Sequence, residues 1–112
     1  MNIDPEDLEK IRDWAKRHSE ISEIWIYGSR AREDNHPDSD IDLAIVMKPS
    51  TGDENTLATW MSWFKRFKES PDLNLKHNVH LEWYEPNAGL ERVGPGVQRD
   101  GVRIYSAGVK SM

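Results

Sequence analysis

The sequence has no cysteine, which excludes disulfide bonds and thiolate metal sites. It also has no apolar run near the roughly 20 residues that a membrane-spanning helix needs. The N-terminal stretch MNIDPEDLEK is acidic and polar, unlike a secretory signal. These absences predict a cytoplasmic protein that folds without covalent cross-links.

Positive charge is also in short supply. Fifteen Lys and Arg stand against 20 Asp and Glu, for a formal net charge of −5. A chain with this balance has no global basic field to draw it to nucleic acid or to an anionic membrane. We therefore expect no direct nucleic-acid binding and no membrane association, although a local pocket for phosphates is compatible with the charge.

The apolar share is only 37%, but five Trp, three Tyr and two Phe supply bulky side chains for burial. At 112 residues the chain is near the commonest size of one domain. No repeat or internal linker stands out in it. We predict a single domain over residues 1–112, with 108–112 as a loose tail.

Local patterns predict alternating helices and strands. Helices are predicted at 5–19, within 29–39, at 54–69 and, in pieces interrupted by Gly94-Pro95-Gly96, at 88–99. Strands are predicted at 22–28, 40–47, 78–84 and 102–105. This order predicts an α/β (α+β) fold, in which helices pack on a small mixed sheet of about four strands.

The helix predicted at 54–69 has a broad apolar side. It carries Leu57, Trp60, Met61, Phe64 and Phe67, and Trp63 widens it further. Core packing against the sheet explains most of this width. The alternative is an exposed patch that meets a partner, with Trp60 or Trp63 as the anchor.

Two acids share one face of the strand predicted at 40–47. Because side chains alternate along a strand, Asp40 and Asp42 point together. Like charges side by side repel, and a divalent cation offsets that cost directly. Mg²⁺ suits such a pair, since it takes one or two carboxylates and leaves positions for phosphate oxygens and water. The alternative is a solvent-exposed face with two harmless acids.

A second feature precedes the acids. Gly28 and Ser29 end one strand and begin the short helix, where free N–H groups meet an anion readily and glycine allows close approach. Arg30 and Arg32 are candidate counter-charges for phosphate. A strand that ends in Gly-Ser, then ten residues, then Asp-Ile-Asp-Leu on a second strand is a far more specific pattern than either piece alone.

This compound pattern resembles the signature of the polymerase β-type nucleotidyltransferase superfamily. It consists of Tyr27-Gly28-Ser29-Arg30-Ala31-Arg32 followed by Ser39-Asp40-Ile41-Asp42-Leu43-Ala44. The strong match covers residues 24–47, and the ending 100–105 resembles the usual C-terminal strand more weakly. The short chain most resembles the minimal nucleotidyltransferases (MNT), antitoxin-like proteins paired with HEPN-domain toxins.

The resemblance implies a Mg²⁺-dependent enzyme that moves a nucleoside monophosphate, AMP above all, from ATP or another NTP to an acceptor. The acceptor would be a partner protein such as a HEPN toxin, and the chain would act as its antitoxin. Asp40 and Asp42 would hold Mg²⁺ against the triphosphate, while Gly28 and Ser29 would cradle the β- and γ-phosphates. The alternative is a binding module, catalytically weak or inactive, that neutralises its partner by direct contact.

The family usually adds a third carboxylate on a later strand, and the candidate here is Glu82. The resemblance implies that Glu82 completes the metal site and helps to deprotonate the acceptor. The competing interpretation is an edge-strand charge that discourages aggregation. Glu33 stands where many relatives have Gly, and its acid would either repel the triphosphate or point to solvent.

The histidines show no metal-binding pattern. His77 and His80 are three residues apart, which places them on opposite faces of a strand. His18 and His36 have no partner at ligand spacing. We expect all four to be ordinary surface or half-buried side chains, with His80 the one that borders the site.

Overall fold

The computed structural model describes residues 1–36, 39–48, 56–85 and 93–107. Helices and strands alternate along this part of the chain. In order they are α1 (Pro5–Lys16), β1 (Ile21–Tyr27), α2 (Ser29–Arg32), β2 (Ile41–Met47), α3 (Leu57–Glu69), β3 (Val79–Trp83), α4 (Val93–Asp100) and β4 (Val102–Ser106). The predicted order of elements is therefore confirmed, with α1 shorter than predicted.

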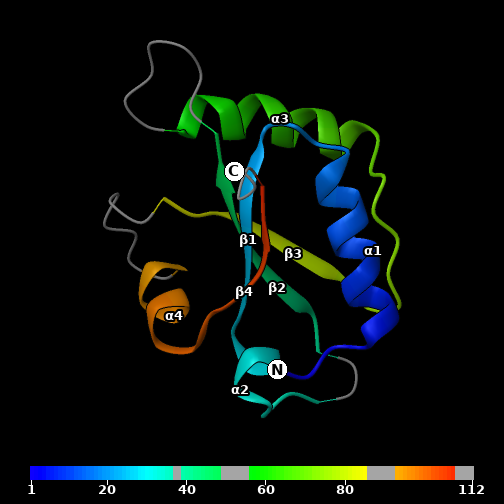
Figure 1. The fold of residues 1–112 in the computed structure, drawn as a ribbon, viewed down its shortest axis with the longest axis vertical. Coiled ribbons are helices and arrows are strands. Elements are labelled where there is room, and N and C mark those ends of the chain that lie inside the picture. Colours follow the sequence, from blue (N-terminus) through cyan, green and yellow to red (C-terminus); the bar gives the residue numbers. More distant parts are fainter. Residues whose placement is uncertain (37–38, 49–55, 86–92, 108–112) are drawn as a thin grey trace.

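The strands form one mixed sheet in the order β3-β2-β1-β4. β1 runs antiparallel to both β2 and β4, whereas β3 runs parallel to β2. Figure 1 shows the sheet between α1 on one side and α4 on the other. The predicted fold class, a small mixed sheet with helices packed on it, is confirmed.

Helix α1 begins as its sequence predicts. The Asp4 side chain accepts a hydrogen bond from the Glu6 backbone N–H, and Pro5 occupies the first helical turn. Glu6 and Asp7 complement the positive end of the helix dipole. The buried side of the helix presents Ile11, Trp14 and Ala15 to the sheet.

One face of the sheet and the helices α1 and α3 enclose the main core. From α3 the core receives Trp60 and Trp63, which are 9% and 1% exposed. The interpretation of these two tryptophans as surface anchors is therefore wrong. Leu57 and Met61 instead are the exposed apolar residues of this helix, because the buried side is centred on Trp63 and not on Met61.

The opposite face of the sheet is covered in part by α4. A smaller cluster there joins Ala44, Tyr84 and Val97, with Trp25 and Tyr27 packed against it. The predicted interruption at 94–96 is wrong, because these residues lie inside α4, where proline is tolerated in a first turn. A Cβ on Gly96 would lie 3.3 Å from the Tyr27 ring, so the glycine lets the helix approach the sheet closely.

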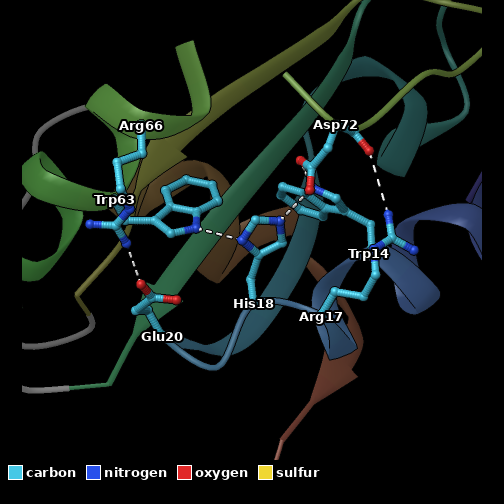
Figure 2. A network of polar contacts seen from close by, with 7 residues as sticks. All are labelled: Trp14, Arg17, His18, Glu20, Trp63, Arg66 and Asp72. Carbon is cyan, nitrogen blue, oxygen red and sulfur yellow. Dashed lines mark hydrogen bonds and ion pairs between the residues drawn. The ribbon is translucent and has the colours of Figure 1, made fainter. Parts of the chain in front are cut away.

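A polar network ties α1, α3 and the segment before β3 together (Figure 2). The Trp63 indole N–H donates to His18 Nδ1 (3.0 Å), and His18 Nε2 lies 2.8 Å from Asp72 Oδ2. The Trp14 indole N–H donates to the other Asp72 oxygen (2.7 Å). We call these four residues the aromatic clasp.

The hydrogen-bond donors of the aromatic clasp determine which ring nitrogen of His18 carries the proton. An indole N–H can only donate, so His18 Nδ1 accepts and carries no proton. The proton is then on Nε2, which donates to Asp72. Burial raises the pKa of Asp72, but hydrogen bonds from Trp14 and His18 outweigh it and hold this pKa below its ordinary value.

Candidate functional site

The ends of β1 and β2 bring the Gly-Ser segment to the acidic strand. The antiparallel register pairs Tyr27 with Asp42, so Gly28, the next residue, lies beside the Asp42 carboxylate. Gly28 has φ +78°, and a Cβ built on it would lie 2.6 Å from Asp42 Oδ2. Only glycine fits both this backbone conformation and this contact.

Asp42 is ionised at a cost. Its side chain is 27% exposed. Burial raises the pKa of Asp42, His80 opposes that effect, and the negative charges of Asp40 and Glu82 add to it, so that this pKa lies above its ordinary value. Asp40 is exposed and lies just before β2. The two predicted acids therefore interact through their charges, and a bound cation would relieve the repulsion.

The neighbouring strand brings a histidine to Asp42. In the parallel β2–β3 register, His80 lies opposite Asp42 and Glu82 lies opposite Ala44. His80 Nδ1 is 3.6 Å from Asp42 Oδ1, and His80 Nε2 is 3.0 Å from Glu82 Oε1. Asp40, Asp42, His80 and Glu82 therefore gather on one side of the sheet, which we call the acidic face.

Arg30 is buried, with only 4% of its surface exposed. Its Nε and Nη2 donate to the Ser39 carbonyl (3.1 and 2.8 Å), and Nη1 donates to the Asn2 carbonyl (3.2 Å). These bonds hold the backbone immediately before Asp40. The Arg30 guanidinium, predicted as a counter-charge for phosphate, thus connects α2 to the backbone just before the acidic strand.

Arg32 is the more accessible of the two arginines. It forms ion pairs with Asp34 (3.0 Å) and with Asp100 (3.6 Å) at the end of α4. The hydrogen bond with Asp34 is the largest cause of a raised pKa for Arg32. Ser29, the first residue of α2, is half-buried and follows Gly28 directly.

The unusual residue Glu33 ends α2 in the left-handed conformation, with φ +65°. Glycine adopts that conformation without strain, whereas glutamate adopts it at some cost. The Glu33 carboxylate pairs with the amino group of Met1, and this contact lowers the pKa of Glu33. The amino group of Met1 thereby partly compensates the charge of Glu33. Along the chain, Glu33 lies at some distance from the acidic strand.

The acidic face fits a divalent cation that arrives with other ligands. Within the described residues, no three His, Asp or Glu side chains stand ready as a metal cluster. Mg²⁺ bound through one or two carboxylates takes its remaining ligands from phosphates and water, and the pair Asp40 and Asp42 meets that requirement. The raised pKa of Asp42 is the cost that such a cation would offset.

The sequence predicts that His80 borders the site, but its place between Asp42 and Glu82 depends on the β2–β3 register. The bonds from Arg30 to backbone carbonyls carry no signal in the sequence, since an exposed and a buried arginine look alike there. Among the described helices, none is long and apolar enough to cross a membrane.

Comparison with known families gives an extensive match. The family model described as "Polymerase beta, Nucleotidyltransferase" matches residues 9–107. A search of curated proteins finds no match. The matched range includes both Gly28 and Asp42.

Solved structures share the fold at low sequence identity. A toxin–antitoxin complex with AMP-PNP is 21% identical, with a TM-score of 0.56 over 88% of this chain and 73% of that chain. A nucleotidyltransferase described as putative from Sulfolobus solfataricus is also 21% identical, with a TM-score of 0.50 over 94% and 81%. A mutant of the toxin–antitoxin MntA-HpeT is 19% identical, with a TM-score of 0.52 over 89% and 73%. At these identities the likeness establishes the fold.

Proposed function

Because the chain belongs to the polymerase beta nucleotidyltransferase family, we propose that it is a Mg²⁺-dependent nucleotidyltransferase that uses ATP. It transfers AMP to a side chain of a partner protein and acts as an antitoxin. The partner is a HEPN-type toxin, and both proteins are cytoplasmic. Residues 1–112 act as one domain in this proposal, because the described helices all pack on one sheet.

The observation that carries the proposal is the contact between Gly28 and Asp42. It joins the two halves of the family signature, which are separated in the sequence, at adjacent strand ends. A triphosphate that binds along the Gly28–Ser29 backbone would therefore lie beside the carboxylates that hold the cation of the nucleotide. Backbone N–H groups at this turn donate hydrogen bonds to the oxygens of the β- and γ-phosphates.

The chemistry is an in-line displacement at the α-phosphorus. The acceptor hydroxyl oxygen forms a bond to this phosphorus, the bond to the bridging oxygen breaks, and pyrophosphate leaves with that electron pair. When bound, Mg²⁺ stabilises the charge on the attacking and leaving oxygens. Asp40 and Asp42 hold the ion, and the carboxylates of the acidic face are the available acceptors for the hydroxyl proton.

The arginines have different roles in this proposal. Arg30 positions the acidic strand, because its guanidinium is buried and donates to the Ser39 carbonyl. Arg32 binds the phosphates. Its ion pairs with Asp34 and Asp100 are weak surface contacts, so a triphosphate competes for it readily.

The antitoxin role rests on the described setting of similar structures. Two of them are toxin–antitoxin complexes, one with the ATP analogue AMP-PNP. The described residues form the sheet and its covering helices, and the acceptor in this proposal brings its own recognition surface. A dedicated protein partner satisfies that requirement.

The test is incubation of the protein and the product of the adjacent gene with α-labelled ATP and Mg²⁺. We expect label on the partner and none after the double substitution Asp40→Ala/Asp42→Ala. The matched control is Glu9→Ala/Asp13→Ala, which removes two exposed acids of α1 and leaves transfer intact. Circular dichroism and thermal unfolding check that both variants fold.

A binding module is the second candidate, and one observation favours it. His80, not a third carboxylate, lies opposite Asp42. In that case the Asp40→Ala/Asp42→Ala variant still binds and neutralises the partner. The partner then carries no label after incubation with either the wild type or the variant. That result would replace the transferase proposal.

A further inference from the structure

His80 differs from every other residue of the acidic face because it can supply nitrogen to a cation. It is 55% exposed and lies on β3 directly opposite Asp42. Its two ring nitrogens have different neighbours: Nε2 is 3.0 Å from Glu82 Oε1, and Nδ1 is 3.6 Å from Asp42 Oδ1. The ring therefore stands between the two carboxylates.

The Glu82 contact determines which nitrogen can serve as a ligand. An ionised carboxylate only accepts hydrogen bonds, so His80 Nε2 carries the proton and donates it to Glu82. Nδ1 is then the nitrogen on the Asp42 side, 3.6 Å from Oδ1. A divalent cation between these two atoms binds both of them and takes the place of a proton there.

The same arrangement surrounds histidines that bind metals in proteins. Such a histidine commonly donates its second N–H to a carboxylate, which fixes the tautomer and the ring orientation. Ligand atoms at right angles on an ion with bonds of about 2.1 Å are about 3 Å apart. The 3.6 Å between Nδ1 and Oδ1 is close to this value, and a small rotation of the exposed ring closes the difference.

We propose that His80 is a direct nitrogen ligand of the divalent cation held by Asp42, and that Glu82 orients the imidazole without binding the cation itself. This inference rests on the proposed function, because it concerns the cation that accompanies the nucleotide. It changes the predicted role of Glu82 from metal ligand to positioning residue. The reason is the strand register, which places Glu82 opposite Ala44 and not opposite Asp42.

The donor set determines the preference of the site among cations. Carboxylates, phosphates and water suit Mg²⁺, whereas an imidazole favours first-row transition metals. A site with Asp42 and His80 should therefore bind Mn²⁺ in preference to Mg²⁺. Replacing His80 by aspartate restores an all-oxygen site and reduces that preference by about tenfold or more.

The experiment uses the whole protein with Mn²⁺ and a non-hydrolysable ATP analogue. Electron spin echo envelope modulation detects nitrogen bound directly to Mn²⁺, and ¹⁵N labelling of the protein separates its nitrogen from that of adenine. We expect protein nitrogen at the metal in the wild type and none in His80→Asp. The matched control His77→Gln, on the same segment, keeps the signal.

The affinity for Mn²⁺ tests the role of Glu82. Glu82→Gln keeps the nitrogen signal, while the affinity for Mn²⁺ falls about 10- to 100-fold, as is usual when an orienting carboxylate is lost. Thermal unfolding shows whether each variant is folded.

Two results would overturn the inference. If the wild type binds Mn²⁺ with no protein nitrogen, or if His80→Asp keeps the nitrogen signal, His80 is not the ligand, and the proposed transferase function still stands. If neither Mn²⁺ nor Mg²⁺ binds together with the nucleotide, the proposed function fails as well. The experiment can therefore reject nitrogen ligation by His80 without rejecting metal binding.

Discussion

The aromatic clasp and the acidic face each contain a histidine that lies against a carboxylate through Nε2, but the second ring nitrogen differs between them. In the clasp, His18 Nδ1 accepts a hydrogen bond from the Trp63 indole. In the acidic face, His80 Nδ1 faces the Asp42 carboxylate. The first histidine lies between an indole donor and one carboxylate, and the second lies between two carboxylates.

This difference separates a structural centre from a binding centre. The clasp satisfies both oxygens of Asp72 with protein donors, and the pKa of Asp72 is lowered. The acidic face leaves Asp42 with a raised pKa, because burial and neighbouring acids disfavour its charge. A charge that is destabilised in the free protein is stabilised further when a cation binds, which is the usual cost of a functional site.

The largest expected effect is that of Asp42→Asn. We expect AMP transfer to fall about a thousandfold, equivalent to about 4 kcal/mol, because the cation loses its central carboxylate. We expect the free energy of unfolding to rise by about 0.5–1 kcal/mol, because the amide is neutral like the protonated acid that burial favours. Labelled-ATP transfer and urea unfolding measure the two effects. A loss of stability would contradict the contrast with the clasp.

Gly28→Ala tests the close approach that forms the acidic face. We expect a loss of about 2–3 kcal/mol in unfolding free energy, because the new Cβ meets Asp42 Oδ2 and the φ of +78° strains any residue but glycine. In an Asp42→Ala background the clash disappears and only the strain remains, so the same substitution should cost less. Equal costs in both backgrounds would show that the contact with Asp42 is unimportant.

Asp72→Asn breaks the clasp without touching the acidic face. Asp72 accepts from two N–H donors, and an amide offers only one oxygen, so one donor would face an NH₂ group. We expect a loss of about 1 kcal/mol in unfolding free energy, with transfer unchanged. Asp13→Asn, an exposed acid of α1, is the control with no expected loss. A change in AMP transfer would contradict the separation between the aromatic clasp and the acidic face.

The smallest effect is the pH dependence of the clasp. The pKa of Asp72 is lower in the folded state than in the unfolded chain, where it is about 3.9. Its contribution to stability is therefore complete above about pH 4 and is lost as the pH falls through the folded pKa. Urea unfolding from pH 6 to pH 2 should show a steeper acid loss for the wild type than for Asp72→Asn. Parallel curves would refute the assignment.

Much of the fold was predictable because its signals are local. The capped start at Asp4, the β-branched run of β1 and the alternation in β2 each depend on a few neighbouring residues. Gly28 and Asp42 were identified together for the same reason, because they belong to one short signature. Their contact follows from two adjacent strands, which the pattern already implied.

Other features depended on packing between distant segments. His18 and Asp72 are 54 residues apart, and nothing near either residue indicates the pair. The buried side of α3 was predicted to include Met61, which is 64% exposed, because helical periodicity alone does not determine which side meets the sheet. Gly94 to Gly96 suggested a break, yet packing of Gly96 against Tyr27 accommodates them in a helix.

The sequence by itself therefore determined the family, the fold class and the acidic pair, because each is a matter of residue type at short spacing. Only the tertiary structure decided that His80, and not Glu82, lies opposite Asp42. A shift in the β2–β3 register changes which side chain lies opposite Asp42, and that register is determined by how β3 packs beside β2. The identity of the third group at the site is thus a property of strand register.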